Sequence, residues 1–232
     1  MTFLIANLLE IFQLGSEIAG VLDLPRKHWP QPGQYLPCQR VDDAVDGLPT
    51  HLFRVVGAAD LLNLAPIPEA WSPGDRLACV PPQGHGFALP GFAQRVGLIP
   101  FNVSPARLLS IAGTALSQSA AVSLFYETPS TVGWLERVSS QVEILPLSAL
   151  QENLDWPDYL AVDLDRSVIP EFMDRINICD LHCRGQVLVR TDMPCRGLAE
   201  CGVCAVHTRH GWRYVCVDGP VFPLEEVLHV AR

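Results

Sequence analysis

The cysteines near the carboxy-terminal end constrain this chain more than any other feature of its sequence. Of the 8 cysteines in 232 residues, six crowd into residues 179–216. They are Cys179, Cys183, Cys195, Cys201, Cys204 and Cys216. The overall share is too small for a disulfide scaffold, in which cysteine exceeds about 8% of the residues. A local group of this kind indicates a metal or redox site instead of scattered disulfides.

Composition and charge exclude several classes of protein. Hydrophobic residues make up 49% of the chain and charged residues 18%, which excludes a disordered chain and allows a sizeable core. A net charge of −9 without a basic run excludes a nucleic-acid-binding protein. No uninterrupted apolar stretch reaches the ~18 residues of a membrane span. Residues 1–14 lack the basic start and cleavage site of a signal peptide. We therefore expect a cytoplasmic protein, in whose reducing surroundings clustered cysteines are usually metal ligands or redox groups.

The first third of the chain has the pattern of β structure. Two apolar runs, 8–14 and 17–24, flank a Gly15-Ser16 hairpin signal. Further short strands are expected over 33–37, 51–56 and 76–80, with Gly- and Pro-rich turns between them. Short strands at this spacing predict a small antiparallel β-barrel over residues 1–94.

Residues 95–192 alternate short strands and helices. Strands are expected over 95–100, 120–127, 142–146 and 158–163, with a final strand over 186–191. Helices are expected over 106–118, 130–138, 148–153 and 169–176. Ser104 and Pro105 have the residue types of an N-cap and first helical position, and Asp163 and Asp165 are interpreted as strand-end caps. The alternation predicts a parallel sheet covered by helices on both faces.

Four of the cysteines have the spacing C-x5-C-x2-C-x11-C, formed by Cys195, Cys201, Cys204 and Cys216. A [2Fe–2S] cluster needs four thiolates, and the plant-type pattern takes three from one loop and the fourth from a distant turn. Gly197 and Gly202 allow the tight backbone that directs amide N–H groups at sulfur. We expect a strand over 212–217 to deliver Cys216.

Structural zinc is the main alternative, because a four-cysteine zinc site also uses the C-x2-C spacing. Cys179 and Cys183 could even pair with Cys201 and Cys204 as a zinc ribbon. The unequal x5 and x2 spacings within one loop favour iron–sulfur, which leaves Cys179 and Cys183 as bystanders. Cys38 and Cys79 lie in apolar, strand-like contexts and are predicted to be core residues.

At these cysteines the sequence resembles a known family. The segments CGVCAV (201–206) and YVCVDGPVF (214–222) are similar to the iron–sulfur domain of the electron-transfer subunit of NAD-linked dihydroorotate dehydrogenase, a ferredoxin-reductase-like flavoprotein. Weaker similarity covers most of the remaining chain. It lies in PGQY (32–35), FRVVG (53–57), PGD (73–75) and GHGFALP (84–90). The resemblance implies a barrel over 1–94, a nucleotide-domain-like sheet over 95–192 and a [2Fe–2S] subdomain over 193–232.

By this resemblance, the cluster would carry single electrons between a flavin, FAD, and a catalytic oxidoreductase subunit that acts in pyrimidine biosynthesis. The chain would then be an electron-transfer component and not a self-sufficient enzyme. Three departures stand out. The cluster loop has one residue more than the family usually has, and the flavin-contacting Arg-x-x-Ser strand expected after PGQY is not found. The loop 99–106 contains no glycine where a dinucleotide needs close backbone approach.

These departures leave FAD binding open and predict poor NAD(H) binding. Our alternative hypothesis is a non-redox scaffold with a structural four-cysteine zinc site and no nucleotide binding. His85, His207 and His210 are interpreted as solvated loop residues, and no hydrolase triad, P-loop or HExxH motif is present.

Overall fold

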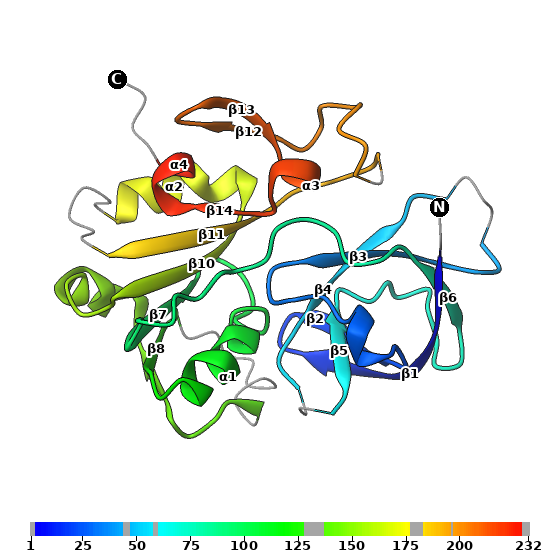
Figure 1. Ribbon diagram of the computed structural model, residues 1–232, viewed down its shortest axis with the longest axis horizontal. Coiled ribbons are helices and arrows are strands. Elements are labelled where there is room, and N and C mark those ends of the chain that lie inside the picture. Colours follow the sequence, from blue (N-terminus) through cyan, green and yellow to red (C-terminus); the bar gives the residue numbers. More distant parts are fainter. Residues whose placement is uncertain are drawn as a thin grey trace.

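The computed structural model describes residues 3–43, 47–57, 60–127, 137–176, 183–195 and 197–228. Figure 1 shows two bodies of β structure side by side: a barrel built from the amino-terminal part of the chain and an open sheet flanked by helices. The carboxy-terminal hairpin and its connecting loops lie above the sheet. The predicted class, an antiparallel barrel followed by an α/β sheet, is confirmed.

Six strands close the barrel in the order β1-β2-β5-β4-β3-β6, and all of their pairings are antiparallel. They are β1 (Leu4–Leu14), β2 (Glu17–Leu22), β3 (Tyr35–Arg40), β4 (Thr50–Arg54), β5 (Leu62–Ala65) and β6 (Arg76–Cys79). The hairpin between β1 and β2 turns at Gly15, which has φ 66°. Strand β5 was not expected from the sequence. The prediction that Cys38 and Cys79 are core residues is confirmed, since both are fully buried.

The open sheet has six strands in the order β14-β11-β10-β7-β8-β9. They are β7 (Arg95–Pro100), β8 (Ala121–Phe125), β9 (Val142–Leu145), β10 (Tyr159–Asp165), β11 (Arg184–Arg190) and β14 (Val221–Pro223). The five strands from β7 to β11 pair in parallel, as predicted. The prediction that the sheet ends with 186–191 is wrong, because β14 pairs antiparallel with β11 at the edge. Strand order reverses between β7 and β10, so a ligand crevice is expected at their carboxyl ends.

Helices cover both faces of the sheet, as predicted. They are α1 (Leu109–Ser117), α2 (Ile169–Arg175) and the single turns α3 (Val215–Asp218) and α4 (Leu224–Val227). The 3₁₀ helices of the described residues are η1 (Arg26–His28), η3 (Leu147–Asn153) and η4 (Arg166–Val168). Residues of β10 alternate between the two faces, because successive strand side chains point to opposite sides. Tyr159 packs in the core that includes α1, whereas Leu160 packs in the core that includes Phe172 of α2.

The start of α1 differs from the prediction. Residues 105–108 form a turn and the helix begins at Leu109, whose N–H donates to the carbonyl of Pro105 at 3.0 Å. Ser104 caps that turn, since its hydroxyl accepts a long hydrogen bond from the N–H of Ala106 at 3.4 Å. Most of the helix predicted over 130–138 lies outside the described residues.

Within the described ranges, none of the helices has the length and apolar character needed to cross a membrane. The domain boundaries after residues 94 and 192 stay predictions. Strand β14 contributes to the sheet from beyond the second of these boundaries.

Candidate metal centre

Four cysteines are carried by the segment that leaves the end of β11. A loop takes Cys195, Cys201 and Cys204 to a hairpin of two strands, β12 (Ala205–Thr208) and β13 (Gly211–Tyr214). Cys204 is fully buried, Cys195 is half-buried and Cys201 is exposed. The prediction that a strand delivers Cys216 is wrong: β13 ends at Tyr214, and Cys216 lies buried in the helical turn α3.

The four thiols lie as two pairs. Cys195 is hydrogen-bonded to the thiol of Cys201, and Cys216 is hydrogen-bonded to the thiol of Cys204. The pairs are near enough for the charge of Cys195 to act on Cys216. Cys183 is half-buried immediately before β11. Cys179 lies outside the described residues, as does Arg196 of the cysteine loop.

Backbone N–H groups surround the sulfur atoms. Burial alone raises the pKa of Cys195, but hydrogen bonds from the N–H groups of Glu200 and Leu198 outweigh it and lower the pKa to about 7. Burial and the neighbouring Cys204 raise the pKa of Cys216 to about 12, against one N–H donated by Ala199. The loop therefore holds one thiol already close to ionisation.

The two loop glycines have the backbone conformation expected of them. Gly197 has φ 84° and Gly202 has φ 70°, both in the left-handed region that favours glycine. At Gly202 a Cβ would meet open space. At Gly197 a Cβ would stand 3.5 Å from the hydroxyl oxygen of Tyr35, so the barrel approaches the loop closely at that point.

Both bodies of the molecule hold this segment. From the barrel, the Tyr35 hydroxyl donates to the carbonyl of Cys216 at 2.9 Å. His85 donates its N–H to the carbonyl of Gly219 at 2.7 Å, and its ring Nδ1 lies 2.9 Å from the carbonyl of Asp218. From the sheet, Arg166 donates to two carbonyls on either side of Cys204, those of Val203 and Ala205, at 2.5 and 2.9 Å. His85, His207 and His210 are exposed, as predicted.

The four cysteines are candidate ligands for an iron–sulfur cluster. Each iron of a [2Fe–2S] cluster takes two thiolates, which Cys195 with Cys201 and Cys204 with Cys216 could supply. N–H groups directed at sulfur stabilise the negative charge that a reduced cluster carries. Across the part of the chain that the structure describes, no group of three or more His, Cys, Asp or Glu side chains could hold a metal ion as it stands. Cys195, Cys204 and Cys216 are all near enough for their charges to act on the Tyr35 hydroxyl.

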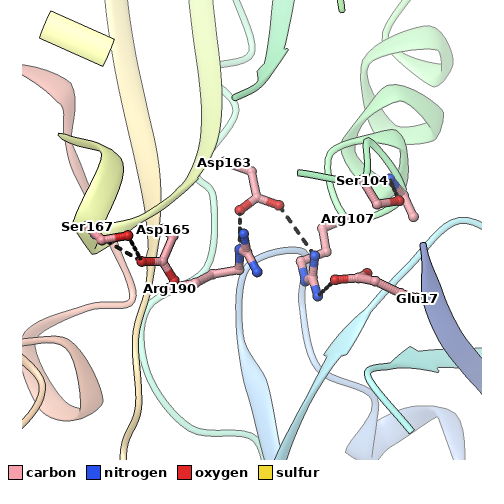
Figure 2. Close-up of polar contacts among 8 residues, drawn as sticks. Glu17, Ser104, Arg107, Asp163, Asp165, Ser167 and Arg190 are labelled. Carbon is pink, nitrogen blue, oxygen red and sulfur yellow. Dashed lines mark hydrogen bonds and ion pairs between the residues drawn. The ribbon is translucent and has the colours of Figure 1, made fainter. Parts of the chain in front are cut away.

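A cavity of about 700 Å³ lies between the barrel and the carboxyl ends of β10 and β11, at the crevice predicted by the strand order. Its charged lining is balanced, with arginines at 107, 166 and 190 and carboxylates at 17, 165 and 192. Figure 2 shows the polar contacts beside it. Asp165 accepts hydrogen bonds from the N–H and hydroxyl of Ser167 at 2.9 and 2.7 Å, which confirms its predicted capping role.

Asp163 does not cap a strand, contrary to the prediction. It is fully buried, with Arg190 Nε at 2.9 Å and Arg107 Nη1 at 3.7 Å (Figure 2). Arg107, only 3% exposed, reaches across to Glu17 of the barrel at 2.6 Å. Burial by itself lowers the pKa of Arg107, but the charges of Glu17 and Asp163 outweigh it and raise that pKa. Buried charges of opposite sign compensate one another here.

His51 of β4 also lines the cavity, and its Nε2 is buried with no hydrogen-bond partner among the described residues. Its ring meets the ring of Tyr35 edge-on at 5.0 Å. Burial lowers the pKa of His51 to about 4, so the ring is neutral at pH 7. Tyr35 thus lies between His51, which lines the cavity, and Cys216, to whose carbonyl it donates.

The residues present do not form a cradle for the diphosphate of a dinucleotide. Arg40 is occupied by Asp43 at 2.7 Å, and Arg54 lies over the ring of Trp29. Beyond β7, Phe101 is fully buried and packs edge-on against Phe172. Asn102 takes a left-handed conformation, φ 56°, in a loop without glycine. The described cavity therefore offers neither the excess positive charge nor the open backbone that a diphosphate needs.

Comparison with known proteins agrees with the cysteine geometry. Residues 192–228 match the family model described as the iron–sulfur cluster binding domain of dihydroorotate dehydrogenase B. That segment contains the four cysteines and α4. Among the curated proteins, none matches the sequence.

Solved structures share the fold at low identity. The structure of an NADH-dependent reduced ferredoxin-NADP oxidoreductase, studied for flavin-based electron bifurcation, aligns with a TM-score of 0.71 at 17% identity over 96% of this chain and 89% of that one. A ferredoxin NADP+ reductase from Neisseria gonorrhoeae with bound FAD and NADP aligns with a TM-score of 0.59 at 14% identity, over 78% of this chain and 92% of that one. The H286L mutant of ferredoxin-NADP+ reductase from Plasmodium falciparum aligns with a TM-score of 0.59 at 11% identity, over 81% of this chain and 96% of that one. The chain therefore resembles the electron-transfer subunit of dihydroorotate dehydrogenase B, in that its carboxy-terminal segment matches that enzyme's iron–sulfur domain and its fold is shared with the ferredoxin reductases.

Proposed function

We propose that this chain is an electron-transfer protein that holds a [2Fe–2S] cluster and exchanges single electrons with a partner oxidoreductase. The ligands would be Cys195, Cys201, Cys204 and Cys216, shaped by Gly197 and Gly202. The observation that carries the proposal is that Cys195 lies close to Cys201 and Cys216 close to Cys204, with backbone N–H groups directed at their sulfur atoms, within the segment that matches an iron–sulfur domain. The barrel over 1–94, the sheet over 95–192 and the cluster subdomain over 193–232 would be its three parts.

A bound cluster supplies a site that accepts and releases one electron at a time. The protein's own part is to hold and shield it. Cys195 and Cys201 would bind one iron, and Cys204 and Cys216 the other. N–H groups of Leu198, Glu200 and Ala199 would stabilise the sulfur charge.

Burial differs between the two ends of the site. The Cys204 and Cys216 end is buried against the barrel and sheet, whereas Cys201 is exposed. A partner would therefore approach from the Cys201 side. The resemblance to dihydroorotate dehydrogenase B supports a catalytic subunit of that type as the partner, in pyrimidine biosynthesis.

No step is assigned to FAD or NAD(H), because the described residues offer no diphosphate cradle. Heating purified protein and measuring flavin fluorescence in the supernatant tests the flavin directly. We expect less than stoichiometric flavin, and no quenching of tryptophan fluorescence by NADH at micromolar concentrations.

The deciding experiment is the visible spectrum of anaerobically purified protein, with iron, sulfide and zinc analysis. We expect bands at roughly 400–550 nm that bleach with dithionite, and two irons and two sulfides per chain. Cys195→Ser and Cys216→Ser should lose the bands, whereas Cys183→Ser, half-buried and outside the segment, should keep them. A colourless protein with one zinc per chain would establish the structural-zinc alternative instead.

A further inference from the structure

Tyr35 links the barrel to the proposed cluster through one hydrogen bond. The residue is completely buried at the start of β3. Its hydroxyl donates at 2.9 Å to the carbonyl of Cys216, 181 residues away in the sequence. A phenol hydroxyl buried in this way usually has a partner, and here the partner is the backbone of a proposed iron ligand.

The surroundings hold the phenol in this position. Its ring meets His51 edge-on at 5.0 Å and lies 5.9 Å from the ring of Phe53. Its backbone N–H and carbonyl both pair with Gln83, at 3.2 and 2.9 Å. On the cluster side, Gly197 packs close to the hydroxyl, since a Cβ there would stand 3.5 Å from it. The ring is therefore packed between residues of the barrel and the cysteine loop.

A fixed dipole beside an iron–sulfur cluster changes the free energy of adding an electron. Hydrogen bonds and burial around the sulfur atoms are the means by which proteins set cluster potentials. The Tyr35 hydroxyl places its positive hydrogen against the carbonyl oxygen of Cys216 and partly neutralises it. Without that donor, an unpaired carbonyl dipole would lie beside the cluster in surroundings of low dielectric constant, where its effect is large.

We infer that Tyr35 is a positioning residue that raises the reduction potential of the cluster through its hydrogen bond to Cys216. The inference rests on the proposed function, because it needs a cluster on the four cysteines. It assigns the barrel a part in electron transfer beyond that of a scaffold: the barrel supplies the outer-sphere donor.

The test is Tyr35→Phe, which removes the hydroxyl and keeps the ring. Tyr159→Phe is the matched control. Tyr159, the first residue of β10, is also buried and donates its hydroxyl to the side chain of Gln186 at 2.6 Å. Midpoint potentials are measured by anaerobic redox titration followed in the visible spectrum, together with the electron paramagnetic resonance spectrum of the reduced proteins. We expect a lower potential and altered g values for Tyr35→Phe, and wild-type behaviour for Tyr159→Phe.

The possible failures are distinguishable. Wild-type protein without iron and sulfide overturns the proposed function and this inference together. Fully loaded Tyr35→Phe with an unchanged or raised potential overturns the inference alone, as does an equal shift in Tyr159→Phe. If Tyr35→Phe does not retain iron, 3-fluorotyrosine at position 35 keeps the ring and hydroxyl and makes the hydroxyl a stronger donor. That substitution should raise the potential, and no rise contradicts the inference.

Discussion

Arg107, in the turn before α1, lies 2.6 Å from Glu17 at the start of β2 and so joins the sheet to the barrel. The same guanidinium lies 3.7 Å from the buried carboxylate of Asp163. Arg107 is thus the cation shared by a carboxylate of the barrel and a buried carboxylate of the sheet.

Replacing Arg107 by Met should lower the free energy of unfolding by about 3–5 kcal/mol, because it leaves the fully buried Asp163 with Arg190 alone and the half-buried Glu17 without its arginine. Urea unfolding followed by circular dichroism measures this. Arg175→Met is the control: Arg175 forms an ion pair of the same length with Glu127, 2.6 Å, but both side chains are exposed. The control should lose less than about 1 kcal/mol. Equal losses would show that the contact between sheet and barrel is not stabilised by burial of the pair.

Gly197→Ala should reduce both stability and iron content. A left-handed residue with a Cβ costs roughly 1–2 kcal/mol, and at this position the Cβ would also contact the Tyr35 hydroxyl, 3.5 Å away, beside the cysteine loop. Gly74→Ala isolates the first effect, because Gly74 has φ 97° with open space around its Cβ position. Thermal unfolding should show a loss for both variants, whereas iron per chain should fall only for Gly197→Ala. Full iron loading of Gly197→Ala would disprove a specific role for this glycine in the loop.

His51 should make the protein less stable in mild acid. Its folded-state pKa of about 4 lies below the ordinary 6.5, so the unfolded chain binds more protons between these values. The contribution of His51 to stability is complete above pH 6.5 and is lost as the pH falls towards 4, by at most about 1.4 kcal/mol per pH unit.

The measurement compares urea unfolding of wild type and His51→Gln from pH 7.5 to 5. Carboxylates that titrate in this range are common to both proteins, so they cancel in the difference. We expect the wild type to lose more stability than the variant over the range. Parallel curves would contradict a buried, neutral His51.

Local patterns predicted the elements whose causes are local. Apolar runs and glycine turns were enough for β1, β2, β7 and most of the parallel strands, because periodicity and turn chemistry act over a few residues. The spacing of cysteines marked the candidate site for the same reason. The three-residue strand β14 was missed, because its existence depends on pairing with β11 and not on its own pattern.

Long-range pairing accounts for the other differences. Asp163 was interpreted as a strand cap, yet its partners Arg107 and Arg190 lie on other elements and meet it only in the folded sheet. Tyr35 appeared in the sequence only as part of PGQY, and nothing nearby indicated a bond to Cys216. Cys216 was assigned to a strand because its flanking residues are β-branched or aromatic, whereas Asp218 accepts from the N–H of Tyr214 and closes a helical turn there.

The antiparallel pairing of β14 with β11 has a consequence for how a cluster would be acquired. Leu188 lies opposite Val221, so the sheet edge brings together the two ends of the stretch that carries all four cysteines. Closure of that loop, with its loss of chain entropy, is complete once the sheet has formed. Zinc fingers, in contrast, are unfolded until metal arrives. We therefore expect a cluster to be inserted after the sheet has folded, into a loop whose ends are already held together by β11 and β14.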